Sequence, residues 1–189
     1  MKKGRIIIIS GPSGSGKTTL NRKLLQSKRL KKKLVKSISV TTRLARLGEK
    51  NGRDYLFVSR KLFLFKKRAG HFLEWQKVFD NYYGTPRKAV EQLIKSGKSV
   101  LLCIDVKGAR TVSRKCPDAI KIFIMPPSLV ILNERLAKRG TETPTSLSLR
   151  LAIAQREMKE ASQYQYVLVN DQLTIASNRL ESIILSELN

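Results

Sequence analysis

Several residue types are scarce in this sequence, and each shortage excludes a kind of functional site. Its 189 residues include two cysteines and one histidine. Cys103 and Cys116 cannot build a disulfide framework, and their spacing matches no metal-binding motif. Because His71 is the sole histidine, neither a serine-type catalytic triad nor a histidine-rich metal centre is expected.

Acidic side chains are also scarce. The chain has 38 lysines and arginines against 14 aspartates and glutamates, a formal charge of +24. Residues 1–48 hold fourteen basic side chains, and Glu49 is the first carboxylate. Such a surface attracts polyanions through counterion release, which gives affinity without specificity. Nucleic acid is therefore expected to bind only non-specifically, and RNA binding as an added activity stays an alternative.

Long apolar runs are missing. A membrane-spanning helix needs about 18 or more consecutive apolar residues, whereas the run IIII at 6–9 is far shorter. The polar stretch from Gly11 to Thr18 follows it, with neither the apolar core nor the cleavage site of a signal peptide. We expect no membrane association and a cytoplasmic location.

The apolar residues that are present alternate between strand-like and helix-like patterns. RIIIIS (5–10) is β-branched and unalternating, which is typical of a buried parallel strand. Further strands are expected at 37–42, 98–105, 118–125 and 164–170, and helices after residue 17 and at 86–97, 127–140, 144–161 and 172–188. The basic run at 28–36 is interpreted as a solvated helix end and turn. This alternation predicts an α/β fold with a mostly parallel sheet covered on both faces.

The pattern changes between 43 and about 90. RDYLFVS (53–59) predicts a short strand, and aromatic residues are concentrated in this part of the chain. Aromatic side chains more often pack in a core than bind a ligand. Most of these rings are therefore expected to form the core of a smaller subdomain.

One motif points directly to nucleotide chemistry. GPSGSGKT (11–18) matches G-x-x-x-x-G-K-[ST] between a predicted strand and a predicted helix. Glycines let backbone N–H groups turn toward an anion at the helix N-terminus. Lys17 can reach the β- and γ-phosphates, and the Thr18 hydroxyl can bind Mg²⁺. The sequence therefore predicts a nucleoside triphosphate site with Mg²⁺ as its cofactor.

The rest of the chain carries further motifs in order. They are SISVTTRLARLGEKNGRDYLFVS (37–59), GHFLEW (70–75), NYYGTP (81–86), LLCIDVKGAR (101–110), PPSLVILNERLAKRG (126–140) and YVLVND (166–171). With the P-loop, they make the chain closely resemble the guanylate kinase family nearly from end to end. The resemblance implies transfer of the γ-phosphoryl group of ATP to GMP in purine nucleotide metabolism, with dGMP as a further acceptor.

The resemblance also implies an architecture. The expected fold is a P-loop NTPase-type doubly wound parallel sheet of about five strands, with an inserted α+β GMP-binding lobe and a helical lid. Residues 1–38, 94–126 and 162–189 would form the P-loop core, 39–93 the GMP-binding lobe and 127–161 the lid region. The oligomeric state stays open between a monomer and a homo-oligomer.

Four residues match the family's grip on the acceptor phosphate. They are Arg43, Arg46, Tyr55 and Tyr83. Guanidinium groups bind phosphate oxygens in pairs, and phenol hydroxyls add neutral hydrogen bonds. Spacing alone would favour core packing for the two tyrosines, with the hydroxyl at the rim, and only the resemblance reverses this interpretation. Glu49 and Gly84 complete this part of the implied GMP site.

Guanine recognition is carried over to Ser39, Glu74, Thr85 and Asp105. A carboxylate such as Glu74 can accept from guanine N1–H and the 2-amino group together, and the Thr85 hydroxyl can donate to O6. Adenine offers neither match, so rejection of AMP is expected. Asp105 ends a buried strand, where doubly wound sheets place their ligands. The family places it near the metal and the acceptor, with contact to Mg²⁺ through water as one reading.

The remaining implied residues serve ATP and the transferred group. The implied ATP-binding set is Gly11, Ser13, Gly14, Ser15, Gly16, Lys17, Thr18, Thr19, Asn170 and Asp171. Arg135, Arg139 and Arg150 match the family's lid arginines, and with Lys17, Arg43 and Arg46 they form the implied catalytic set. Phosphoryl transfer needs positioning and charge neutralisation more than covalent chemistry. Arginines are suited to both tasks.

Two departures from the family pattern stand out. LARLGE (44–49) lacks the prolines usual beside the acceptor arginines, so a less rigid loop is expected, and TETPTSLSLR (141–150) lacks some of the acidic residues usual in the lid. Two alternative functions are a non-catalytic guanylate-kinase-like binding module and a kinase acting on a sugar phosphate. Intact Lys17, Thr18 and lid arginines argue against the first, and Glu74 with Thr85 argues against the second.

Overall fold

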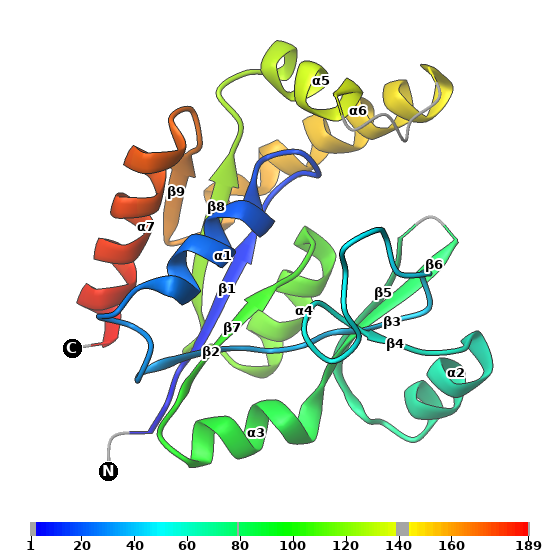
Figure 1. The fold of residues 1–189 in the computed structure, drawn as a ribbon, viewed down its shortest axis with the longest axis vertical. Coiled ribbons are helices and arrows are strands. Elements are labelled where there is room, and N and C mark those ends of the chain that lie inside the picture. Colours follow the sequence, from blue (N-terminus) through cyan, green and yellow to red (C-terminus); the bar gives the residue numbers. More distant parts are fainter. Residues whose placement is uncertain (1–2, 79, 139–143, 189) are drawn as a thin grey trace.

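The chain folds around two β-sheets of different size (Figure 1). A computed structural model describes residues 3–78, 80–138 and 144–188. The larger sheet has five strands and the smaller has four. The mixed α/β architecture with a five-stranded parallel sheet confirms the predicted fold class.

The larger sheet is entirely parallel. Its strands are β1 (Ile6–Ser10), β2 (Leu34–Lys36), β7 (Ser99–Cys103), β8 (Ile120–Met125) and β9 (Tyr166–Val169), in the spatial order β2-β7-β1-β8-β9. Parallel strands lie between two helical layers and are therefore apolar on both sides. The run of isoleucines in β1 is buried along its whole central part for this reason.

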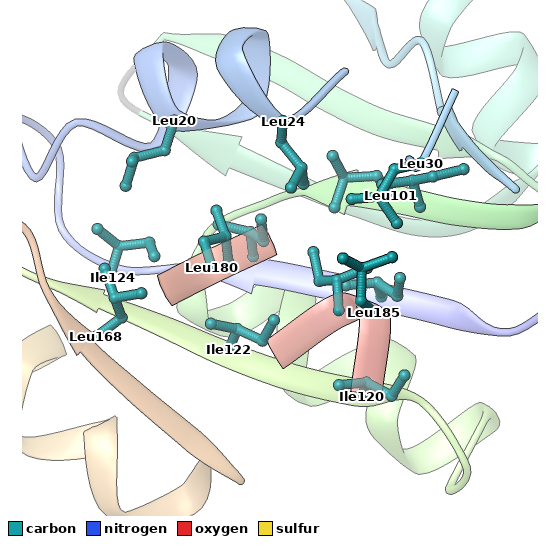
Figure 2. Close-up of a cluster of buried hydrophobic side chains, with 14 of the residues drawn as sticks. Leu20, Leu24, Leu30, Leu101, Ile120, Ile122, Ile124, Leu168, Leu180 and Leu185 are labelled. Atoms are coloured by element: carbon teal, nitrogen blue, oxygen red, sulfur yellow. The ribbon is translucent and has the colours of Figure 1, made fainter. Parts of the chain in front are cut away.

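Alternate side chains of β1 serve the two faces of this sheet. Ile7 and Ile9 pack toward α1 (Lys17–Gln26) and α7 (Leu173–Leu188). Ile8 belongs to the opposite cluster, with α3 (Arg87–Lys95) and α4 (Val106–Lys115). Figure 2 shows Leu20 and Leu24 pointing from α1 toward Leu180 of α7 and the strands. Each such buried leucine stabilises the fold by about 1.5–3 kcal/mol, so the P-loop lies on a rigid base.

The smaller sheet forms a lobe at one side of the larger one (Figure 1). It contains β3 (Val40–Thr41), β4 (Leu56–Phe57), β5 (Phe72–Val78) and β6 (Asn81–Pro86), in the order β4-β3-β6-β5. Helix α2 (Arg60–Arg68) starts where the Ser59 hydroxyl accepts from the Leu62 amide. Phe63 and Phe72 are buried and stacked 4.6 Å apart, as the aromatic pattern predicts, whereas Phe65 is 63% exposed.

The predicted strand at 37–42 is correct only at Val40–Thr41. The chain instead forms β2 at Leu34–Lys36 in the larger sheet and β3 at Val40–Thr41 in the smaller one, and residues 37–39 connect the two sheets. The predicted solvated helix end and turn at 28–36 is therefore wrong for its last three residues, because Leu34 pairs with Ser99 and is buried. A strand of three residues among lysines is too short to show a hydrophobic period.

Three further elements cover the P-loop end of the larger sheet. They are α5 (Leu129–Ala137), α6 (Pro144–Lys159) and the 3₁₀-helix η1 (Glu160–Gln163). Leu132 and Leu136 of α5 pack against Ala154 of α6. Both helices agree with the predicted ones. Within the described residues, no helix combines the length and apolar character that crossing a bilayer requires.

Candidate active site

The P-loop is held open by its glycines and by one buried amide. Gly16 has a φ of 93°, and a Cβ added there would lie 2.1 Å from Asn170 Nδ2. That same amide donates a 2.8 Å hydrogen bond to the Ser15 carbonyl. Glycine is required at position 16 by conformation and by space. Asn170, which follows β9, therefore stabilises the conformation of the loop that follows β1.

The charged and hydroxyl groups of the loop are in place for an anion. Lys17 Nζ donates to the carbonyls of Gly11 and Pro12 at 2.7 and 2.8 Å. Thr18 is exposed in the first turn of α1. The N-terminus of α1 adds a partial positive charge at the same place. The arrangement can hold a polyphosphate, as the motif predicts.

The two helices α5 and α6 bring predicted lid arginines to this loop. A Cβ added at Gly14 would lie 2.7 Å from Leu132 Cδ1, so α5 touches the loop directly. Arg150 Nη1 of α6 donates to Ser13 Oγ at 3.4 Å. Arg135 Nη2 donates to the Asn170 carbonyl at 3.0 Å. The third predicted arginine, Arg139, lies outside the described residues.

Three of the four predicted acceptor-phosphate residues meet in the smaller lobe. The rings of Tyr55 and Tyr83 lie edge to face with centroids 6.0 Å apart. The Arg43 guanidinium lies 5.5 Å from the Tyr55 ring centroid. Burial raises the pKa of Tyr55 to about 12, so its phenol keeps its proton and can donate a hydrogen bond. Arg46 is exposed on the same loop.

A carboxylate occupies the Arg43 fork in this structure. Arg43 Nη2 donates to both carboxylate oxygens of Glu49 at 2.9 Å, and the Arg46 amide donates to the same carboxylate at 2.8 Å. Burial opposes ionisation of Glu49, but these hydrogen bonds hold its pKa below the ordinary value. Glu49 therefore orients Arg43 and takes the place that another planar or tetrahedral anion could take.

The predicted guanine-binding pair is buried and bonded internally. Glu74 of β5 and Thr85 of β6 are paired across the two strands and are 4% and 0% exposed. The Thr85 hydroxyl donates to Glu74 Oε1 at 2.5 Å. Burial raises the pKa of Glu74 to about 7. A carboxylate held away from water in this way is suited to binding a ligand with matching N–H donors.

Glu74 also reaches the edge of the larger sheet. A Cβ added at Gly108 would lie 2.8 Å from Glu74 Oε2 and 3.1 Å from Asp105 Oδ1. Asp105 follows β7 and caps α4 by accepting from the Gly108 amide at 2.6 Å. Burial raises the pKa of Asp105 as well. Two carboxylates from different sheets therefore lie close together around Gly108.

The other predicted residues lie nearby on the same strands and loops. Gly84 is buried in β6, where it pairs with Val40 of β3 and Trp75 of β5. Ser39 directly precedes β3, and its carbonyl accepts from the Leu56 amide at 2.9 Å. Asp171 follows Asn170 at the end of β9. The described members of the predicted set thus lie in the P-loop, in the smaller lobe, on α5 and α6, and on the segments that follow β7 and β9.

One partly buried carboxylate of α6 is not among the predicted residues. Glu157 of α6 is half-buried, and burial raises its pKa to about 7. Lys17 and Asp105 are among the charged groups that act on it. Sequence reasoning missed Glu157 because it belongs to no local motif. Only its position on the helix could have signalled it.

The oxygen donors of the site fit magnesium. Thr18 is exposed in the P-loop, and the neighbouring residue Lys17 acts electrostatically on the Asp105 carboxylate. Mg²⁺ prefers oxygen ligands and usually keeps several waters, with substrate phosphates as further ligands. In the parts of the chain that the structure describes, no three acidic, histidine or cysteine side chains form a metal-binding group.

Comparison with known proteins agrees with this geometry. A family model described as guanylate kinase matches residues 3–187. Guanylate kinase of Symbiobacterium thermophilum is 44% identical over 185 residues, covering 98% of this chain and 86% of the relative. Guanylate kinase of Carboxydothermus hydrogenoformans is 41% identical over 187 residues, covering 99% and 90%. The crystal structure of guanylate kinase from Anaplasma phagocytophilum matches with a TM-score of 0.82 at 37% identity, over 99% of this chain and 87% of that one.

Proposed function

The chain belongs to the guanylate kinase family and transfers the γ-phosphoryl group of ATP to GMP, and we propose from this premise a role for each group of residues. The observation that carries the assignment is the buried pair of Glu74 and Thr85 in the lobe beside the P-loop. A non-catalytic binding module would need neither Lys17 nor Thr18, and no observation favours it.

ATP binds with its phosphates in the P-loop. Backbone N–H groups of the loop, to which Pro12 contributes none, hold the phosphate oxygens, and Lys17 moves from the Gly11 and Pro12 carbonyls to the β- and γ-phosphates. Thr18 holds the magnesium ion, which neutralises charge on the phosphates when bound. The segment Asn170–Asp171 flanks the adenine, and its position follows from the hydrogen bond between Asn170 and Ser15.

The acceptor phosphate binds in the smaller lobe between Arg43, Arg46, Tyr55 and Tyr83. Arg43 is already oriented by Glu49 through two hydrogen bonds. The protonated phenol of Tyr55 donates without adding charge. Guanidinium forks match a phosphate in geometry and in charge. Arg46 is exposed in this structure and turns inward when the phosphate arrives.

Guanine is recognised by Glu74 and Thr85, with Ser39 and Asp105 beside them. Glu74 accepts from N1–H and the 2-amino group, and the Thr85 hydroxyl, which donates to Glu74 here, turns to donate to O6. Adenine would leave the buried carboxylate without its donors, at a cost of about 1–3 kcal/mol or more. The site therefore rejects AMP. Because no proposed contact involves the ribose 2′-hydroxyl, dGMP is also an acceptor.

The helices α5 and α6 act as a lid. Arg135, Arg139 and Arg150 neutralise charge on the transferred phosphoryl group, and Arg150 already contacts the loop residue Ser13. The proposed functional division assigns residues 1–38, 94–126 and 162–189 to the core, 39–93 to the GMP-binding lobe and 127–161 to the lid. Closure excludes water that would otherwise hydrolyse ATP. The reaction takes place in the cytoplasm.

A coupled assay of ADP release tests these proposals. ATP and Mg²⁺ are supplied with GMP, dGMP, AMP or ribose 5-phosphate as acceptor. We expect rapid turnover with GMP, slower turnover with dGMP, and background rates with AMP and the sugar phosphate. Chelation of Mg²⁺ with EDTA should abolish turnover. Equal rates with AMP and GMP would contradict the role of Glu74 and Thr85, and EDTA-resistant turnover would contradict the role of Thr18.

A further inference from the structure

One stripe of side chains on α6 and η1 faces the rest of the molecule. It comprises Arg150, Ala154, Glu157 and Ala161, spaced by four, three and four residues, which places them on one side of a helix. Arg150 contacts Ser13 of the P-loop. Ala154 is buried against α5, and Ala161 is buried against the core residues Val106 and Phe123. Glu157 lies between the two alanines and therefore faces inward.

Glu157 is an unusual residue for that position. It is half-buried, and no hydrogen bond or ion pair reaches its carboxylate from the described part of the chain. Its neighbour Glu160, three residues along, is paired with Arg110 at 2.7 Å. A partly buried carboxylate without a partner costs free energy. A bound ligand that donates hydrogen bonds to the carboxylate would offset this cost.

The groups around Glu157 identify the ligand. The charged side chains that act on it are Lys17, Asp105 and Lys107. Ala161 of η1 packs with Val106 of α4 and with Phe123 and Tyr164, so the end of α6 lies against the start of α4, where Asp105 is the cap residue. Both carboxylates also act electrostatically on the phenol of Tyr164. Lys17 donates to backbone carbonyls in this structure and to phosphates in the proposed complex. A hydrated cation bound with those phosphates would supply hydrogen-bond donors to both carboxylates.

We propose that Glu157, together with Asp105, accepts hydrogen bonds from the water molecules that accompany Mg²⁺ into the phosphoryl-transfer site. Mg²⁺ keeps several of its waters in proteins, and acceptors for those waters orient the ion. Because Glu157 lies on the same helix as Arg150, it also links the position of the lid to the presence of the metal. This inference rests on the proposed binding of Mg²⁺ with ATP at the P-loop.

Substitution of Glu157 by glutamine tests the proposal in the full chain. Glutamine keeps the shape of the side chain but removes the charge. Glu160→Gln is the matched control, because it removes a carboxylate three residues away that is paired with Arg110. Mn²⁺ replaces Mg²⁺ as the probe, and free Mn²⁺ is counted by electron paramagnetic resonance in the presence of ADP and GMP. Glu157→Asp, which keeps the charge on a shorter chain, is measured alongside.

Removal of a metal-orienting acceptor weakens metal affinity by about 10–100-fold. We therefore expect about tenfold weaker Mn²⁺ binding in Glu157→Gln, an intermediate value in Glu157→Asp, and less than twofold change in Glu160→Gln. Metal-free ADP should bind Glu157→Gln as tightly as the unmodified protein or more tightly, because a negative charge near the phosphates is gone. A merely structural role for Glu157 would instead weaken ADP binding with and without metal.

Three results separate the inference from the proposed function. Unchanged Mn²⁺ affinity in Glu157→Gln, in a protein whose unmodified form phosphorylates GMP, overturns the inference alone. Equal weakening of metal-free and metal-bound ADP also overturns it. Absence of Mg²⁺-dependent turnover in the unmodified protein would overturn the proposed function itself.

Discussion

Replacement of Glu74 by glutamine should increase stability and decrease activity at the same time. Glu74 is 4% exposed, and burial raises its pKa to about 7 from an ordinary value of 4.5. In the unfolded chain the carboxyl ionises near its ordinary pKa, whereas in the folded protein it keeps its proton until about pH 7. The free energy of unfolding therefore falls as the pH rises from about 4.5 to about 7. At 1.36 kcal/mol per pH unit, the loss is about 3 kcal/mol above pH 7.

Glutamine carries no charge at any pH, and its oxygen can still accept from the Thr85 hydroxyl. We expect the free energy of unfolding of Glu74→Gln to exceed that of the unmodified protein by about 2–3 kcal/mol at pH 8, with little difference at pH 4. Urea unfolding followed by circular dichroism at both pH values measures this difference. Glu91→Gln, in which an exposed glutamate of α3 is replaced, is the control and should change stability little at either pH.

The same substitution should weaken catalysis with GMP. The amide has one acceptor oxygen where the carboxylate has two, and its NH₂ group faces a guanine donor. The loss of about 3–4 kcal/mol of hydrogen bonding corresponds to a fall in kcat/KM for GMP of about 10²–10³-fold. KM for ATP should stay within about threefold. Unchanged stability at pH 8, or unchanged kcat/KM for GMP, would refute the reasoning.

Three other substitutions test the remaining parts of the site and the core. Arg43→Ala should raise KM for GMP by about 100-fold, because a charged bidentate contact is lost, while KM for ATP changes less than threefold. Arg53→Ala, on the exposed part of the same loop, is the control. Equal increases in KM for both substrates would show that Arg43 does not bind the acceptor phosphate. Asn170→Ala removes the buried hydrogen bond to the Ser15 carbonyl. It should lower the free energy of unfolding by about 1–3 kcal/mol and raise KM for ATP. An unchanged KM for ATP in steady-state kinetics would mean that this hydrogen bond does not hold the P-loop in its binding conformation. Leu180→Ala empties a fully buried position between α7 and the sheet and should cost about 2–5 kcal/mol in urea unfolding; a cost below about 1 kcal/mol would contradict the close packing in Figure 2.

The main sheet was predictable because its strands are long apolar runs. Residues 5–10, 98–105, 118–125 and 164–170 all contain strands of the structure. β2 was not predictable, because three residues among lysines carry no period and become a strand only by pairing with β7. The hairpin of β5 and β6 in the smaller lobe also depends on pairing rather than on local pattern. Tertiary contacts decide such segments.

The candidate site divides in the same way. The P-loop was predictable from its spacing, and the residues proposed to bind GMP came from the family resemblance. The internal bonds between Thr85 and Glu74, and between Arg43 and Glu49, could not be read from the sequence, because each joins residues in different strands or at opposite ends of a loop. Glu157 was missed because its meaning depends on which side of α6 faces the P-loop.

The connection between the two sheets has a consequence for how such a protein can diversify. The chain leaves the larger sheet after β2 and returns to it at β7, and these two strands are neighbours. The Ser37 amide bonds to the Leu101 carbonyl at 3.0 Å, and the Ser99 amide bonds to the Lys33 carbonyl at 2.8 Å. Both ends of the intervening segment are thus hydrogen-bonded to neighbouring strands of the larger sheet. The residues between these two attachments that belong to the smaller lobe can therefore vary between relatives without breaking the pairing of β2 with β7.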